Sequence, residues 1–321
     1  MNTKIFLAGI DIGATNIKYG LVEENGEVVF RSQVQTPDGD KADKIYKAVL
    51  ACGEQLLIEA DDQEGHVEYL GVGSPGTVDT RRGKIDNNCP NLPGWIGFPL
   101  RDRLRDALNL PIYVDNDANC AALGEALCGA GRGIDNLICL TIGTGLGGGI
   151  IIKRHLYHGH NDSAGEIGQI LVPGLFAGEI VRLEELVSSK GILNRLKRQM
   201  ENKASQLLTT LCGNNPEKLT IRKVFTAVGK GDETAQEVVA DTARRLGQVL
   251  AGLVNFLNPG CIILGGGVVE GGSFFVDIVR ESVMKDALTV AARDLKVVAA
   301  ELGNAAGFIG AAFLGRENLS D

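Results

Sequence analysis

Apolar and polar residues follow two patterns along the chain: short apolar runs that end in glycine or a polar residue, and longer stretches with helical spacing. The first run, IFLAGIDIGATNIKYGLVEENGEVVFRSQVQ, predicts three strands, and its Asn25-Gly26 pair predicts a hairpin between the second and third. A second hairpin is predicted in LICLTIGTGLGGGIIIK. Further strands are predicted at residues 68–74, 110–117, 261–267 and 295–300, and helices at about 41–60, 118–128, 179–199, 232–257 and 305–314.

Two segments share one layout. IDIGATNIKYGLV, from Ile10, and LTIGTGLGGGIII, from Leu140, each consist of a strand, a Gly/Thr turn and a second strand. Such an echo suggests a duplicated fold with a cleft between its halves. Chance similarity explains it equally well at this stage, because glycine turns are common in hairpins.

Length and composition narrow the class of protein. At 321 residues the chain predicts two lobes, since domains usually hold about 100–200 residues. The formal net charge of -8 argues against non-specific binding to nucleic acid or a membrane surface. No apolar run reaches the roughly 20 residues that span a bilayer, and the opening residues predict no signal peptide. The seven cysteines are widely spaced and form no CxxC pair, which favours buried thiols and a cytoplasmic protein.

Three glycine-rich turns each follow an apolar run. A turn without side chains exposes backbone N–H groups to an incoming phosphate. In the first turn the strand-ending Asp11 also suits a hydrated Mg²⁺, which takes one or two carboxylates and keeps its waters. The residues predicted to bind the nucleotide are Asp11, Gly13, Thr15, Asn16 and Lys18 in the first turn, Gly143, Thr144 and Gly145 in the second, and Gly265, Gly266 and Gly267 in the third.

Each turn alone is a weak signal, because glycine is the default wherever φ must be positive. The chain has no GxxxxGK[ST] loop. GTGLGG is followed by another predicted strand, whereas a dinucleotide fingerprint needs a helix there. Three such turns together indicate a nucleotide site.

The segment VDNDAN carries Asp115, Asn116, Asp117 and Asn119 where a predicted strand meets a predicted helix. Asp and Asn are preferred helix N-caps, so one of the four is expected to cap the helix. Capping uses only one of them. A carboxylate at a strand end near a phosphate site can accept the proton of an attacking hydroxyl. We therefore predict that Asp117 is a general base and that Asn116 binds the acceptor molecule.

The motifs DIGATNIK, GVGSPGTVD, VDNDANCAALGEA, LTIGTGLGGG, SAGEIG and LGGG, in this order over essentially the whole chain, resemble the ROK family of sugar kinases. The resemblance implies an α/β, two-lobed actin/hexokinase-like (ribonuclease H-like) fold with an interlobe active-site cleft. We expect a small lobe from residues 1–117 and about 300–321, and a large lobe from 118–299.

The same resemblance implies ATP- and Mg²⁺-dependent phosphorylation of a hexose, most simply glucose at its 6-hydroxyl, by a homodimer or homotetramer. It assigns the role of base to Asp117 and adds Thr141 to the phosphate-binding residues. The implied sugar ligands are Gly76, Asn116, Asp117, Glu166, Gln169 and Glu184.

The chain departs from the family pattern after GEIG. Most members carry a histidine where this chain has Gln169, followed by a CxCGxxGC loop that binds a structural zinc together with it. Here no cysteine lies between Cys139 and Cys212, so no zinc site is expected. A glutamine amide can donate and accept hydrogen bonds but cannot carry positive charge. We expect retained sugar binding with altered selectivity.

Other features leave alternatives open. His155, His158 and His160 fit no standard zinc spacing and are interpreted as residues of a solvated loop. Another hexose, or an N-acylated aminohexose such as N-acetylmannosamine, remains a possible substrate because specificity rests on one or two hydrogen bonds. A non-catalytic sugar-sensing regulator also remains open, since the family includes repressors. Direct DNA binding is not expected of so acidic a chain.

Overall fold

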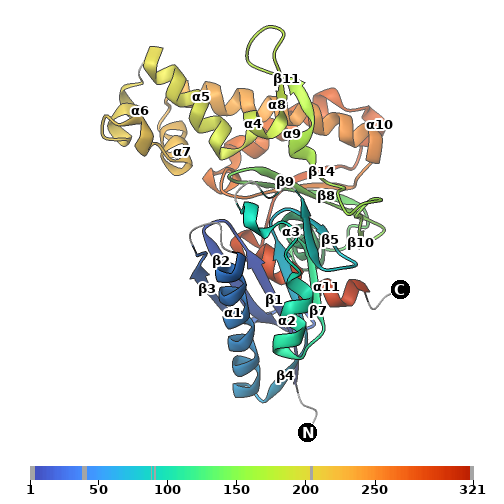
Figure 1. The fold of residues 1–321 in the computed structure, drawn as a ribbon. Coiled ribbons are helices and arrows are strands. Elements are labelled where there is room, and N and C mark those ends of the chain that lie inside the picture. Colours follow the sequence, from blue (N-terminus) through green and yellow to red (C-terminus); the bar gives the residue numbers. More distant parts are fainter. Residues whose placement is uncertain (1–3, 38–41, 88, 90–91, 203–204, 319–321) are drawn as a thin grey trace. The chain divides into compact units, whose positions relative to one another are not determined.

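The computed structural model describes residues 4–37, 42–87, 89, 92–202 and 205–318, and the chain forms two compact units (Figure 1). The first comprises Met1–Asp135, Gly149–Gly165 and Asn304–Asp321, and the second Asn136–Gly148 and Glu166–Gly303. This division differs from the expected one at residue 117. The helix that follows residue 117 belongs to the first unit, because it packs against the C-terminal helix of that unit.

A five-stranded sheet of order β3-β2-β1-β4-β7 forms the centre of the first unit. Neighbouring strands β1, β2 and β3 are antiparallel, whereas β4 runs parallel to β1 and to β7. The predicted Asn25-Gly26 turn joins β2 to β3, and Gly26 has the positive φ, 89°, that such a turn requires. The strands are β1 (Lys4–Ile12), β2 (Asn16–Val22), β3 (Val28–Gln35), β4 (Gly65–Ser74) and β7 (Ile112–Asn116), with a small hairpin of β5 (Thr77–Asp79) and β6 (Lys84–Asn87) beside it.

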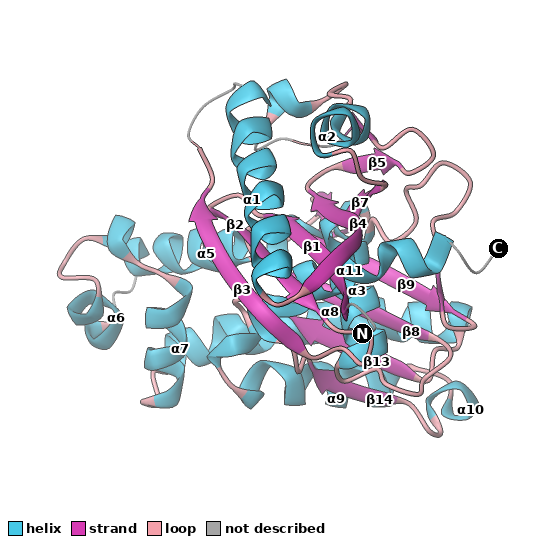
Figure 2. Ribbon diagram, turned by 90° about the horizontal axis from the view of Figure 1, so that it is seen from below, coloured by secondary structure: helices cyan, strands magenta, loops and turns pink. Residues whose placement is uncertain are grey.

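Helices cover both faces of this sheet (Figure 2). Ile10 of β1 shares an apolar core with Val49 of α1 (Ala42–Asp62) and Leu104 of α2 (Leu100–Leu108). The expected start of the first helix at residue 41 lies outside the described residues. On the other face α11 (Ala306–Asn318) packs on the strands and on α3 (Asp117–Cys128). Successive strand residues point to opposite faces, so each face carries its own helices.

Glycines let α11 approach its neighbours closely. A Cβ on Gly71 of β4 would lie 1.7 Å from the carbonyl oxygen of Ala311, and one on Gly310 would lie 1.7 Å from the carbonyl oxygen of Cys120 in α3. Neither position can hold a side chain without displacing backbone. The start of α3 is therefore held at a fixed distance from α11.

The second sheet has the order β10-β9-β8-β13-β14, and the boundary between the units falls inside β9. β10 is antiparallel to β9, and β13 is parallel to both β8 and β14. This order repeats that of the first sheet, which favours duplication over chance as the origin of the sequence echo. The strands are β8 (Leu137–Ile142), β9 (Leu146–Ile152), β10 (His155–Leu156), β13 (Cys261–Gly265) and β14 (Lys296–Ala299).

Helices pack on the sheet of the second unit, and the core includes Leu140 and Ile262 from the strands together with Leu246 and Leu250 from the longest helix. Asp232 caps that helix, because its carboxylate accepts a hydrogen bond from the Ala235 N–H. The helices are α4 (Leu183–Val187), α5 (Ser189–Asn202), α6 (Gln206–Leu211), α7 (Ile221–Gly229), α8 (Glu233–Leu257), α9 (Ser273–Asp286) and α10 (Thr289–Ala292). Within the described chain, no helix is long and apolar enough to cross a membrane.

The segment after Gln169 differs from expectation. A helix was predicted from residue 179, but Ile180–Arg182 forms strand β12, which pairs antiparallel with β11 (Leu171–Pro173). In the turn between β11 and β12, Glu179 accepts hydrogen bonds from the N–H groups of Leu175 and Phe176. The helical pattern begins only at α4. A three-residue strand is too short for its alternation to be recognised in the sequence.

Candidate functional site

Three strand ends of the first unit bring site residues together. Asp11 on β1 is the cross-strand partner of Gly73 on β4, and Gly73 is the partner of Asp115 on β7. These strands are parallel, so their carboxyl ends lie at one edge of the sheet, where ligands of α/β sheets usually bind. Burial raises the pKa of the nearby Cys120 thiol, and the negative charges of Asp115, Asp11 and Asp117 raise it further. The charges of all three carboxylates therefore act on one buried residue of the fold.

Asn116 and Asp117 stand where β7 passes into α3. The side-chain oxygen of Asn116 accepts hydrogen bonds from the N–H groups of Ala118 and Asn119, so this is the one of the four polar residues that caps the helix. Its Nδ2 donates to the carbonyl oxygen of Gly76, 3.0 Å away, in a turn where Gly76 has a φ of 92°. Asp117 opens the helix with a half-buried carboxylate, whose Oδ1 lies 2.8 Å from the Ala118 nitrogen.

Asp11 and Lys18 face each other across β1 and β2 beside the first glycine turn. Burial raises the pKa of Asp11 to about 6, although the charge of Lys18 acts in the opposite direction. The Lys18 ammonium also donates to Asn304 Oδ1 at 2.9 Å. A Cβ on Gly307, in the first turn of α11, would lie 2.6 Å from the Asp11 carboxylate. A close-packed carboxylate whose negative charge is disfavoured by burial suits a divalent cation.

The described residues contain no group of three His, Cys, Asp or Glu side chains arranged to hold a metal ion. A hydrated Mg²⁺ does not require such a group, because it keeps several waters and takes one or two carboxylates. Asp11 meets that requirement.

The two predicted glycine turns are supported in corresponding ways, each within its own unit. The Gly13 carbonyl between β1 and β2 accepts a hydrogen bond from the Thr36 hydroxyl at 2.7 Å. The Gly143 carbonyl between β8 and β9 accepts one from the Ser189 N–H at 2.8 Å. Thr15 and Thr144, the threonines of the two turns, are both exposed. Their hydroxyls are accessible to a ligand.

The third glycine cluster lies beside the second turn. Gly266 has a φ of 90°, and a Cβ there would meet the Ile142 carbonyl oxygen at 2.6 Å. The Val268 N–H donates to the same oxygen at 3.1 Å. Within the second unit, Thr141 and Gly265 are cross-strand partners on β8 and β13. The structure therefore brings together two of the three segments that the sequence assigned to the nucleotide.

Gln169 and Glu184, two predicted sugar ligands, contact each other in the second unit. Gln169 Nε2 donates to Glu184 Oε1 at 3.0 Å. Glu184 Oε2 lies 3.3 Å from where a Cβ on Gly145 would stand, so this carboxylate adjoins the second glycine turn. Glu166 precedes the short helix η2 (Ile167–Gln169) as its N-cap residue and is half-buried. Gln169 thus holds Glu184 in place.

The histidine run needs a correction. His155 and His160 are exposed, as a solvated loop predicts, but His158 is half-buried and its Nε2 lies 2.6 Å from Asp115 Oδ2. The hydrogen bond with Asp115 raises the pKa of His158, in opposition to burial, which lowers it. A solvated loop therefore does not describe this residue.

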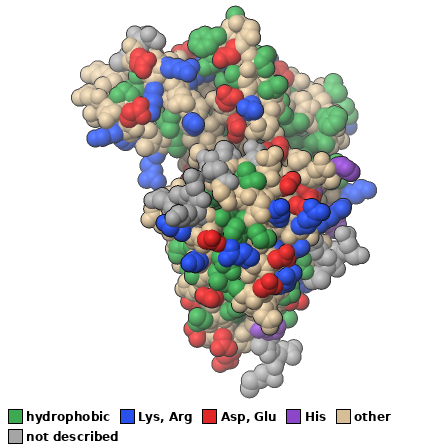
Figure 3. Space-filling view, viewed as in Figure 1, with side chains coloured by type: hydrophobic (Ala, Val, Ile, Leu, Met, Phe, Trp, Pro, Cys, Tyr) green, Lys and Arg blue, Asp and Glu red, His purple; other side chains and the backbone are tan. Residues whose placement is uncertain are grey.

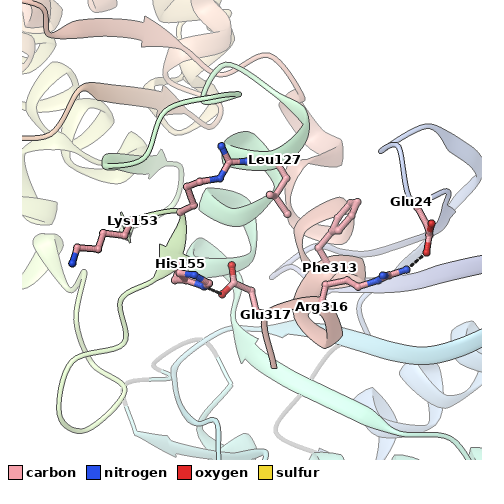
Figure 4. Close-up of a pocket in the computed structure, with 8 residues that line it drawn as sticks. Glu24, Leu127, Lys153, His155, Phe313, Arg316 and Glu317 are labelled. Carbon is pink, nitrogen blue, oxygen red and sulfur yellow. Dashed lines mark hydrogen bonds and ion pairs between the residues drawn. The ribbon is translucent and has the colours of Figure 1, made fainter. Parts of the chain in front are cut away.

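A further cavity of about 490 Å³ lies in the first unit (Figure 4). In it His155 Nδ1 lies 3.3 Å from Glu317 Oε2, and Arg316 pairs with Glu24. None of the predicted site residues lines it. The lining residues are Glu24, Leu127, Lys153, Arg154, His155, Phe313, Arg316 and Glu317. The face shown in Figure 3 carries both basic and acidic side chains.

Asn304, Gly307 and His158 were not identified from the sequence. Asn304 is 286 positions from Lys18, its hydrogen-bond partner, and no motif links the two. The glycine at 307 resembles any other helical glycine until the fold places Asp11 beside it. His158 was considered only for metal binding, and no feature of its spacing points to Asp115.

Comparison with known proteins places these observations in one family. The family model described as ROK family matches residues 7–318. A glucokinase of Thermotoga maritima is 32% identical over 321 residues, covering 98% of this chain and 99% of that protein. A glucokinase of Halalkalibacterium halodurans is 36% identical over 312 residues, covering 95% and 93% respectively. The structure of a ROK family glucokinase from Streptomyces griseus in complex with glucose and AMPPNP matches with a TM-score of 0.83 and 34% identity, covering 97% of this chain and 99% of that one.

Proposed function

The chain belongs to the ROK family and is a sugar kinase, and we propose that it transfers the terminal phosphoryl group of ATP to a hexose, preferentially to the 6-hydroxyl of glucose. The observation that carries the proposal is the strand-to-helix junction of the first unit. There the half-buried Asp117 carboxylate follows a buried strand end, in the company of Asp11 and Asp115.

Asp117 acts as the general base in this proposal. Its carboxylate accepts the proton of the sugar hydroxyl as that oxygen attacks the phosphorus, which is the proton transfer that phosphoryl transfer to a hydroxyl requires. Asn116 uses its amide oxygen to cap α3 and one amide N–H to hold Gly76. Because an amide NH₂ has two donors, the second remains for a sugar hydroxyl. Asn116 is thus a donor to the sugar.

The second unit supplies further sugar ligands, Glu166 and Glu184. Carboxylates accept hydrogen bonds from sugar hydroxyls, and the Gln169 amide holds Glu184 in orientation for this role. We propose that Gln169 contributes to sugar selectivity through Glu184 as well as by any contact of its own.

ATP is assigned to the glycine turns. The residues proposed to bind it are Gly13, Thr15, Asn16, Lys18, Thr141, Gly143, Thr144, Gly145, Gly265, Gly266 and Gly267. Asp11 would hold Mg²⁺ through water, and the ion would neutralise charge on the phosphates. Family resemblance further suggests a homodimer or homotetramer. The seven free thiols, six of them buried, suit the cytoplasm.

A coupled assay of ADP release over a panel of hexoses and N-acylated aminohexoses tests the proposal. Glucose should give the highest kcat/KM. Asp117→Asn should lower kcat by about 10²–10⁴-fold, the usual contribution of a positioned base. Asp106→Asn, which changes an exposed carboxylate on α2, serves as the control and should leave turnover unchanged. Wild-type turnover by Asp117→Asn would exclude Asp117 as the base, and no ADP release with any sugar would exclude the kinase.

A further inference from the structure

The carboxylate of Asp115 is buried and has three hydrogen-bond donors. Only 4% of the residue is exposed. Its Oδ1 accepts from the Asn116 N–H at 2.6 Å and from Asn119 Nδ2 at 2.9 Å, and its Oδ2 is 2.6 Å from His158 Nε2. A buried carboxylate persists as an anion only if it is paired and hydrogen-bonded. His158, when protonated, forms an ion pair with Asp115.

The charge at Asp115 is close to the proposed base. Asp115 is two residues before Asp117, and the charges of both act on the same Cys120 thiol. An uncompensated anion at Asp115 would disfavour the ionised form of Asp117, because like charges in a poorly solvated site raise each other's pKa. An imidazolium on Asp115 removes most of that repulsion.

His158 also belongs to a structured segment, residues 157–165, that leads directly into Glu166. The Tyr157 N–H donates to the Ile150 carbonyl at 2.8 Å, and the Ala164 N–H donates to the His158 carbonyl at 3.0 Å. Asp162 Oδ2 accepts from the Thr80 N–H at 3.2 Å. Two side chains therefore attach the segment to the rest of the unit. Asp162 contacts Thr80, and His158 contacts Asp115 on β7, the strand that also carries Asn116.

We propose that His158 is a positioning residue for the phosphoryl transfer, an imidazolium that neutralises Asp115 behind the base and fastens segment 157–165 to the end of β7. The proposal rests on the proposed function for its kinetic part. His158 touches neither sugar nor nucleotide in it and acts through Asp115.

The surroundings of His158 keep it charged. The acidic groups that act on it are Asp115 on β7, Asp162 on its own segment and Glu317 on α11. The hydrogen bond with Asp115 raises the pKa of His158 more than burial lowers it. The imidazolium therefore persists to higher pH than a free imidazole and is lost as pH rises through this raised pKa.

The pH profile of kcat/KM for the sugar tests the proposal in the full-length protein. Its acid limb reports the pKa of the base in the free enzyme. His158→Gln keeps an amide donor for Asp115 but removes the charge, so the acid limb should move up by about one pH unit. The double variant Asp115→Asn/His158→Gln removes both charges and should return the limb toward its wild-type position. His160→Gln changes an exposed histidine of the same segment and should leave the profile unchanged.

A merely structural role would lower kcat/KM at all pH values without moving the limb. An unmoved limb in folded His158→Gln would overturn the proposal, and so would a shift of equal size in His160→Gln.

NMR titration of the four histidines in the wild-type protein gives a second measurement that needs no turnover. His158 should titrate at higher pH than a free imidazole, with its signal assigned by its loss from the His158→Gln spectrum. A midpoint for His158 at or below that of a free imidazole would also overturn the proposal. If no sugar is phosphorylated by the wild type, the proposed function fails while the titration still decides whether His158 is the cation on Asp115.

Discussion

The family resemblance implies a histidine at the position of Gln169, whose amide donates a hydrogen bond to Glu184. A histidine in that place can donate a similar hydrogen bond, so the change preserves the orientation of Glu184 while it removes a possible positive charge. The effect of the replacement should therefore appear in discrimination between sugars rather than in loss of binding.

Substitutions at Gln169 separate these roles. Gln169→Glu places a second carboxylate about 3 Å from Glu184 and should raise KM for the sugar about 10- to 100-fold, which corresponds to loss of a hydrogen bond to a charged group. Gln169→His keeps a donor and should change KM only a few-fold. Steady-state kinetics over the hexose panel measures both. Equal turnover by wild type of hexoses that differ at the hydroxyls near Gln169 would contradict a role in selectivity.

At the residue scale, the local sequence pattern predicted those site residues that interact with their immediate neighbours along the chain. The junction of an apolar run and a helical stretch predicted an N-cap among four polar residues, and Asn116 is that cap. The role of Asp117, inferred from the same junction, stays a prediction. His158 could not be predicted, because its partner Asp115 is 43 positions away and only the folded chain brings the two together. Asn304 escaped notice for the same reason.

At the scale of elements, the crossing of α3 and α11 depends on paired glycines. A Cβ on Gly310 would lie 1.7 Å from the Cys120 carbonyl oxygen, and one on Gly124 would lie 2.5 Å from the Ala306 carbonyl oxygen. Because the obstructing atoms are backbone, a side chain can be accommodated only by moving one helix. Asp117 is the first residue of α3, so its position depends on this crossing.

Gly310→Ala should lower the free energy of unfolding by about 1–3 kcal/mol or more, as overpacking does. Turnover should fall further than the unfolded fraction explains, because α3 carries Asp117. Gly252→Ala is the matched control, since a Cβ on this glycine of α8 meets nothing within 4 Å. That variant should gain about 0.5–1 kcal/mol from helix propensity. Urea denaturation measures both, and equal stability of the two variants would show that the close crossing is not required.

Element prediction succeeded where apolar runs were long or turns distinctive, as for β1, β13 and the Asn25-Gly26 hairpin. It failed at β12, whose three residues joined the helical pattern of α4 that follows. The strand exists because β11 pairs with it, and pairing between strands is not encoded in the local pattern of one of them.

At the scale of the whole molecule, stability in acid should depend on an ion cluster that joins helices of the second unit. Asp241 Oδ2 on α8 is 2.5 Å from Arg195 Nη1 on α5 and 2.9 Å from Arg245 Nε. Burial alone would raise the pKa of Asp241, but the hydrogen bonds from the two arginines outweigh it and lower the pKa. The depressed pKa makes the carboxylate stabilising above its unfolded pKa of about 3.9, and this stabilisation is lost as pH falls through the folded value.

Asp241→Asn should therefore reduce the free energy of unfolding at pH 7 by about 1–2 kcal/mol, and the difference from wild type should vanish well below about pH 3.9. Asp277→Asn is the control, because Asp277 pairs with Arg280 but is about half exposed, and it should change stability little. Urea titrations at several pH values supply the comparison. A difference that persists unchanged into strong acid would contradict the assignment.

The repeated strand order of the two sheets corresponds to the echo of two glycine turns, which the sequence alone left undecided between duplication and chance. The boundary between the units could not be predicted from the local sequence. It depends on α3 packing with α11, a contact between residues nearly two hundred positions apart.

Residues 171–182 form the β11–β12 hairpin, which is held by main-chain pairing of its strands. Glu179 stabilises its turn, and Arg245 donates to the Pro173 carbonyl at 3.1 Å. The family resemblance implies that relatives with the cysteine loop form the corresponding closure around a zinc ion. In this chain the described contacts that close the hairpin come from the chain itself. We therefore expect the enzyme to reach its active form in zinc-starved cells, and equal activity after expression with and without a zinc chelator would agree with this.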